Sequence, residues 1–253
     1  MTRLLETYRA VHEQGFIPIF VNDGRDHRML IEACLEAGFR AVEYTLRCDD
    51  AGRMLPYLRK EYPNLHLLVG STLDDEGIVA RARRRYPQLR TLEELDRMGV
   101  DGFVSMFGWS LASIRRYSGS RLVIPTAMSG TEAFRQVGAG AHFIKFFGHD
   151  LPLVRLCRSA PAFDFCPVFV TGGMTLKMIP AAVNAGAVLV ATGFDQMLKQ
   201  EPVKVGKKRV VEVLRLYLTA VRKARGRKWP EMDRCIGGRL KSWLDSLPHH
   251  HPF

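Results

Sequence analysis

The chain has 253 residues, a formal net charge of +11 and 47% hydrophobic residues. This length is enough for one large domain with a full core, and a barrel can use it as a single unit. No apolar stretch approaches the roughly 18 residues that a membrane-spanning helix needs, so no membrane partner is expected.

The N-terminus and the cysteines both bear on the compartment in which the protein works. Residues 1–15 carry Glu6 and Glu13 and lack a long apolar core, so they predict an amphipathic helix and not a signal peptide. The cysteines form no C-x-x-C pair, which indicates neither a zinc site nor a disulfide framework. We expect reduced thiols in a cytoplasmic protein. The cysteines are Cys34, Cys48, Cys157, Cys166 and Cys235.

The positive charge is concentrated near the C-terminus. Residues 201–253 contain 13 Lys or Arg and 5 Asp or Glu, whereas the first 200 residues contain 24 and 21. A basic surface of this kind suits either a solvated helix face or an anionic partner. Because the chain has no zinc finger, RNP motif or helix-turn-helix signature, nucleic acid is not the expected partner.

Strand-like and helix-like segments alternate along the chain. Eight strands are expected, over 16–21, 41–46, 66–71, 101–105, 122–127, 142–147, 166–171 and 188–193. Helices are expected over 27–37, 50–60, 74–85, 129–137, 150–158, 175–185 and 207–226. This alternation predicts an α/β protein of the (β/α)8 TIM-barrel type. A doubly wound open sheet is the alternative, weakened because no Gly-x-Gly-x-x-Gly turn follows the first strand.

The predicted barrel divides the chain into two parts. Residues 1–226 form the catalytic barrel with its N-terminal helix. Residues 227–253 form a basic helical extension, packed on the barrel or at a subunit contact. Active sites of barrels lie at the C-terminal ends of the strands. Polar residues at or near such ends are Arg47, Ser71, Thr72, Ser105, Thr126, Thr171 and Thr192.

The second predicted strand carries an unusual set of polar side chains. Glu43, Thr45 and Arg47 share parity, so they point to one face of the strand. Arg47 suits a carboxylate, which a guanidinium can hold by two parallel hydrogen bonds. Glu43 could transfer protons. A structural ion pair at the strand end is the alternative interpretation.

The sixth predicted strand places a lysine among aromatic side chains, in the run from His142 to Phe147. Lys145 must find an anion there or lose its proton. A neutral lysine amine condenses with ketones to form a Schiff base. The alternative is a lysine that reaches water from the end of the strand.

Four motifs in order resemble those of the KDPG/KHG aldolases, the class I pyruvate aldolases. Glu43 to Arg47 is similar to the family's E-x-T-L-R, and Val69 to Thr72 to its G-x-G-T turn. Ile144 to Phe147 is similar to its F-K-F-F strand, and Thr171 to Met174 to its T-G-G-I turn. The resemblance covers about residues 1–200, and the order and spacing of the four motifs make it specific.

The resemblance implies roles for individual residues. Lys145 would form the Schiff base and Glu43 would be the general acid and base. Arg47 and Thr72 would hold the pyruvate carboxylate, and Phe147 would pack on the keto acid. Further substrate contacts would come from Thr171, Gly172, Gly173 and Gly193. No cofactor or metal is implied, the partners would be pyruvate and an aldehyde, and the family's usual trimer implies a homotrimer.

Two departures from the family pattern bear on the substrate. The family's eighth strand usually ends in Gly-Gly-Ser, which grips a phosphate, but here Phe194 and Asp195 follow Gly193. A carboxylate facing the pocket would repel phosphate, so we expect an unphosphorylated keto acid. Ser105 is followed by Met106, Phe107, Gly108 and Trp109, a bulkier mouth than the family has.

Two other functions stay open from the sequence. Phe107, Trp109 and Phe194 could make an apolar acceptor pocket, in which Lys145 and Glu43 would serve another Schiff-base lyase or a decarboxylase. The chain could also be a non-catalytic barrel that binds an anionic metabolite or nucleic acid through its basic C-terminal part.

Overall fold

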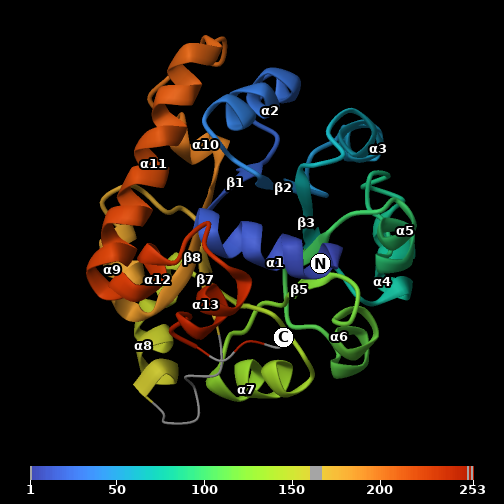
Figure 1. Ribbon diagram of the computed structural model, residues 1–253. Helices are drawn as coiled ribbons and strands as arrows, with labels where there is room; N and C mark the ends of the chain where they lie inside the picture. The colour runs from blue at the N-terminus through green and yellow to red at the C-terminus, as the bar shows by residue number, and fades with distance from the viewer. Residues whose placement is uncertain (1, 160–166, 250, 252) are drawn as a thin grey trace.

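The computed structural model describes residues 2–159, 167–249, 251 and 253. Within them, eight parallel strands form one sheet, in the order β5-β4-β3-β2-β1-β8-β7-β6 (Figure 1). The strands are β1 (Phe16–Phe20), β2 (Ala41–Thr45), β3 (His66–Thr72), β4 (Gly102–Ser105), β5 (Leu122–Ile124), β6 (Ile144–Phe147), β7 (Val168–Thr171) and β8 (Ala187–Gly193).

The sheet closes on itself between β5 and β6. A parallel bridge joins Thr126 to Lys145, and the Lys145 N–H donates to the Pro125 carbonyl at 2.9 Å. The Lys145 carbonyl in turn accepts from the Ala127 N–H at 3.0 Å. This closure confirms the (β/α)8 barrel, and the doubly wound open sheet is wrong.

Helices follow most strands and surround the barrel (Figure 1). They are α1 (Arg3–Gln14), α2 (His27–Glu36), α3 (Ala51–Glu61), α4 (Glu76–Ala82), α5 (Leu92–Arg97), α6 (Leu111–Tyr117), α7 (Gly130–Gly138), α8 (Leu151–Ser159), α9 (Ile179–Ala185), α10 (Phe194–Met197) and α11 (Lys207–Lys228). The short helices α5, α6 and α10 were not among those expected. The helix expected from residue 175 begins at Ile179, where Pro180 suits the first turn.

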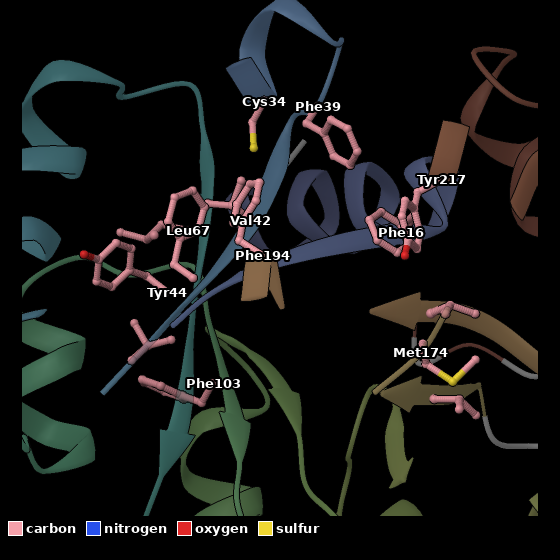
Figure 2. Close-up of a cluster of buried hydrophobic side chains, with 14 of the residues drawn as sticks. Phe16, Cys34, Phe39, Val42, Tyr44, Leu67, Phe103, Met174, Phe194 and Tyr217 are labelled. Carbon is pink, nitrogen blue, oxygen red and sulfur yellow. The ribbon is translucent and has the colours of Figure 1, made fainter. Parts of the chain in front are cut away.

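Side-chain alternation along the strands divides the core into two clusters. Ile17, Leu68 and Phe169 belong to a cluster inside the barrel, where strand side chains fill the interior. Residues of the other parity pack against the helices. Figure 2 shows this outer layer, in which the Phe16 and Tyr217 rings lie 4.9 Å apart. The residues of Glu43 and Lys145 parity therefore point into the barrel.

The C-terminal extension packs against α1 at the N-terminal end of the barrel. Thr7 and Gln14 of α1 hydrogen-bond to residues that begin β3 and β2, which places the helix at that end. In the extension, α12 (Pro230–Arg234) packs against α11, and α13 (Leu240–Asp245) lies near α1 (Figure 1). Trp243 is fully buried, with its ring 6.0 Å from that of Tyr8. The extension thus lies at the end opposite the strand C-termini.

The boundary predicted at residue 226 falls inside a helix. α11 continues to Lys228 and ends before Pro230, because a residue preceding proline is disfavoured in helical conformation. One basic residue of this helix, Arg225, is buried and not solvated; its guanidinium donates to the His12 carbonyl at 2.8 Å. Burial lowers the pKa of Arg225 to about 10. None of the described helices has the length and apolarity to cross a membrane.

Replacing the buried indole should test how the extension is attached. We expect Trp243→Ala to lower the free energy of unfolding by about 3–5 kcal/mol, since it removes a large core side chain. Phe134→Ala is the matched control: Phe134 is 61% exposed, and its loss should change stability by about 0.5 kcal/mol or less. Guanidinium unfolding of both variants measures the difference. Equal, small losses would show that the extension is not docked.

Candidate active site

A cavity of about 400 Å³ lies at the C-terminal ends of the strands. Most of the residues predicted for the site line it. They are Glu43, Arg47, Lys145, Phe147, Thr171, Gly172, Gly173 and Gly193. Residues of β2, β6, β7 and β8 thus meet at one place, although up to 150 positions of sequence separate them. This is the place where barrel active sites lie.

Lys145 projects into the cavity from the closing strand. The side chain is 5% exposed, and its Nζ donates to the Ser105 carbonyl at 2.7 Å. Nζ also lies 5.3 Å from the centre of the Phe147 ring. Burial lowers the pKa of Lys145; the Glu43 carboxylate opposes that shift and Arg47 adds to it. The amine form is therefore more populated than in an exposed lysine.

Glu43 reaches the same cavity from β2. It is 3% exposed, and its Oε2 has no hydrogen-bond partner among the described residues. Burial raises the pKa of Glu43, and the nearby Lys145 and Arg47 only partly offset this. Gly70 on β3 makes room for the carboxyl group, because a Cβ at that position would overlap Oε1 of Glu43. The protonated carboxyl is therefore more populated here than in an exposed glutamate.

Arg47 supplies a free cation at the mouth. The residue is exposed, and its guanidinium makes no hydrogen bond or ion pair with any residue that the structure describes. Among the described residues, Glu43 and Lys145 do not form an ion pair either. The three groups influence one another electrostatically without closing into a salt bridge. The guanidinium stays available for a carboxylate ligand.

Thr72 is the predicted site residue that does not line the cavity. It is fully buried, and its hydroxyl donates to the Val104 carbonyl at 3.0 Å. Ser71 lines the cavity instead, with φ of 60°, a left-handed conformation that is costly for a residue with a Cβ. Among the described residues it is the one non-glycine with positive φ.

The wall formed by β7 and β8 combines glycines with a carboxylate. Gly172 and Gly173 have φ of 89° and 62°, and a Cβ on Gly172 would lie 3.2 Å from Cδ1 of Phe147. Asp195 and Gln196 line the cavity just after β8. The cavity residues that the sequence did not single out include Asn22, which follows β1 and was findable from the rule that barrel sites lie after the strands.

The aromatic acceptor pocket considered from the sequence is not formed. Phe194 is 1% exposed and packs edge-on against Phe20, with ring centres 4.9 Å apart. Trp109 is buried beside Phe103. Phe107 is 65% exposed and lines a neighbouring, more apolar cavity of about 440 Å³. Burying the large rings in the core removes more apolar surface from water than lining a wet cavity would.

Within the described residues, one cluster has the composition of a metal site. The ligand atoms of His27, Cys48 and Asp50 lie within 4.8 Å of one another. However, His27 Nδ1 is already 2.5 Å from the Tyr44 hydroxyl, which itself donates to Asp50. Burial raises the pKa of Cys48 to about 12, so the thiolate that binds metals is scarce at neutral pH. These contacts indicate that His27, Cys48 and Asp50 belong to a hydrogen-bonded part of the layer between strands and helices.

Several solved structures share this fold. No protein-family model matches the chain, and no curated protein does. A native KDPGal structure is 23% identical and covers 83% of this chain and 95% of its own, with a TM-score of 0.64. A KDPG aldolase from Legionella pneumophila, with pyruvate captured as a covalent carbinolamine intermediate, is 17% identical. The match covers 86% of this chain and 97% of that protein, with a TM-score of 0.64. A 2-keto-3-deoxy-6-phosphogluconate aldolase from Zymomonas mobilis is 18% identical. The match covers 84% of this chain and 94% of that protein, with a TM-score of 0.63. The chain has a KDPG/KHG aldolase-like fold.

The environment of Lys145 should appear in its titration. We expect its amine to lose its proton at lower pH than a solvent-exposed lysine does, because burial disfavours the ammonium form. Competitive labelling with acetic anhydride at a series of pH values, followed by peptide mass mapping, follows Lys145 and the exposed Lys177 in one sample. Coincident titration curves would contradict the assignment of a perturbed lysine.

Proposed function

We propose that the protein is a class I aldolase that cleaves or forms a 2-keto-4-hydroxy acid, with pyruvate as the keto-acid half. The observation that carries the proposal is the pairing in one cavity of a buried lysine and a buried glutamate. Burial lowers the pKa of Lys145, which favours the amine that attacks the ketone, and raises the pKa of Glu43, which makes its carboxylate a stronger base.

The first step would use Lys145 as nucleophile. Its neutral Nζ adds to the C2 keto carbon and forms a carbinolamine, and loss of water gives an iminium. The Ser105 carbonyl, at 2.7 Å from Nζ, orients the amine before attack. The positively charged iminium then acts as an electron sink for the bond that breaks.

The second step would use Glu43 as base and then as acid. Its carboxylate accepts the proton of the C4 hydroxyl, the C3–C4 bond breaks, and the bonding pair moves into the iminium to give an enamine and an aldehyde. Glu43 then returns a proton to C3. Water hydrolyses the new iminium, which releases pyruvate and restores the lysine amine. A carboxyl group with a raised pKa suits both directions of transfer.

Binding would fix the register of the reacting carbons. Arg47 holds the C1 carboxylate, and Phe147 packs against the bound keto acid. Thr171, Gly172, Gly173 and Gly193 surround the remaining part of the substrate. We assign Thr72 a positioning role, because its hydroxyl bonds to Val104, next to the Ser105 carbonyl that holds Lys145.

The two other functions have less support. Phe194 and Trp109 pack into the core, which removes the reason for a decarboxylase or lyase with an apolar acceptor pocket. The basic extension lies at the opposite end of the barrel from the cavity, so a nucleic acid bound there would leave Lys145 and Glu43 without a role.

We also propose a homotrimer in the cytoplasm. The trimer rests on the resemblance in sequence motifs. The exposed side chains of Phe107 and Met128 offer apolar surface for a subunit contact. The cytoplasm rests on the cysteines, since the described ones are free and Cys34, Cys48 and Cys157 are buried.

Trapping the intermediate tests the nucleophile. Pyruvate plus borohydride should add one reduced pyruvate adduct per chain to the wild-type protein, because the iminium is the species that borohydride reduces. Lys145→Ala should lose the adduct, and Lys177→Ala, which removes an exposed lysine, should keep it. Intact-mass measurement reads all three. An undiminished adduct on Lys145→Ala would refute the Schiff-base assignment.

The space above Gly70 tests the proton transfer. Gly70→Ala should displace the Glu43 carboxyl group and slow the exchange of pyruvate methyl protons by about 10²–10⁴-fold, the usual contribution of a general acid or base. Glu43→Gln should show a similar loss. Both variants should still form the borohydride adduct.

The control for this prediction is Gly119→Ala, because a Cβ at Gly119 meets no atom within 4 Å. It should exchange at the wild-type rate in deuterated water, as followed by NMR. Undiminished exchange in both Glu43→Gln and Gly70→Ala would assign the proton transfer to another group.

A further inference from the structure

The carboxylate of Asp195 lies in the cavity at a place where it can contact a ligand. Asp195 lines the cavity together with Gly172, Gly173 and Gly193. A Cβ placed on Gly193 would overlap Oδ1 of Asp195, so the carboxylate lies directly over the inward face of that glycine. Phe194, the residue between them, points away into the core.

The Asp195 carboxylate has no partner in the described part of the chain. Asp195 is exposed, and it makes no hydrogen bond or ion pair with any of the described residues. An ionised carboxylate only accepts hydrogen bonds, so its natural ligands are hydroxyl and ammonium donors. Two amide side chains, those of Asn22 and Gln196, line the same cavity. The Asn22 Oδ1 accepts from the Asp49 N–H at 3.1 Å, and its NH₂ group is left to donate elsewhere.

The place of Asp195 in the cavity determines which part of the substrate it would contact. Arg47 after β2 fixes the carboxylate end of the substrate, and Lys145 on β6 holds the keto carbon. The remaining wall, from β7 and β8, faces the part of the substrate that leaves as the aldehyde. A phosphate there would be a dianion beside a carboxylate, and both groups would lack a proton to donate.

We propose that Asp195 is a specificity-determining residue that binds a hydroxyl group of an uncharged, polyhydroxylated acceptor aldehyde and disfavours a phosphorylated one. The inference rests on the proposed aldolase function and names the substrate class of that site. Asn22 and Gln196 complete a polar subsite that can both donate to and accept from the acceptor hydroxyls.

The test compares two acceptors that differ by one phosphate. Condensation of pyruvate with glyceraldehyde and with glyceraldehyde 3-phosphate is measured as kcat/KM for the aldehyde, at saturating pyruvate. The wild type should prefer glyceraldehyde. Asp195→Asn keeps the shape and removes the charge, and should shift the ratio about tenfold toward the phosphate, since one decade corresponds to the loss of a single weakly screened charge interaction.

Asp49→Asn is the matched control. Asp49 is another exposed carboxylate beside the mouth, but it lines the neighbouring cavity and not the one that holds Lys145. It changes the net charge by the same amount and should leave the ratio of the two acceptors unaltered. An equal shift in both variants would show a general charge effect and would overturn the role of Asp195.

Borohydride adducts with pyruvate alone separate the two levels of the proposal, because pyruvate does not reach the acceptor subsite. All three proteins should form the adduct equally. Absence of the adduct in the wild type would overturn both the aldolase function and this inference. A normal adduct with a wild-type preference for the phosphorylated acceptor, or with no change of ratio in Asp195→Asn, would overturn this inference alone.

Discussion

The burial of the Lys145 amine at the closing seam of the barrel is the constraint on which the rest of the site depends. Its N–H and carbonyl both bond to the segment after β5, and β5 and β6 are the two ends of the strand order. The backbone of Lys145 therefore cannot shift without opening the barrel, and strand parity keeps its side chain on the inward face. The fold thus holds the amine in a water-poor place, and desolvation then lowers the pKa of Lys145.

Glu43 and Lys145 do not form a direct salt bridge. The energies of pairing and of desolvation show how this affects the reactivity of the lysine. An ion pair at about 4 Å gains roughly 4 kcal/mol at an effective dielectric constant of 20. Removing each charge from water costs several kcal/mol. A close pair would lock the lysine as an ammonium, which is not a nucleophile. Gly70 lets the Glu43 carboxyl group lie back against β3, which leaves the Lys145 amine without an ion pair in a cavity that a substrate can still enter.

Periodicity along the chain was enough to predict the barrel and the inward parity of Glu43 and Lys145, because strand alternation and barrel closure are regular. It failed where the backbone is irregular. The pairing of β3 with β4 shifts register between Val69 and Thr72, so Ser71 and not Thr72 lines the cavity. After β8 the chain turns at once into α10, so the period changes from two residues to 3.6 at Phe194. That change sends the phenylalanine into the core and leaves Asp195 at the mouth.

The two ends of the barrel differ in how their charged side chains are paired. At the N-terminal end, Asp101 accepts from Arg3 and Arg59, each at 2.7 Å, and Glu13 accepts from Arg40 and the Gly237 N–H. These charges are paired within the protein and are not free to attract an anion. At the C-terminal end, Arg47, Glu43 and Asp195 have no ion-pair partners among the described residues. Arg47 and Asp195 are exposed at the mouth, where water solvates their charges until a ligand displaces it. The ligand that we propose for them has a carboxylate at one end and hydrogen-bond donors at the other.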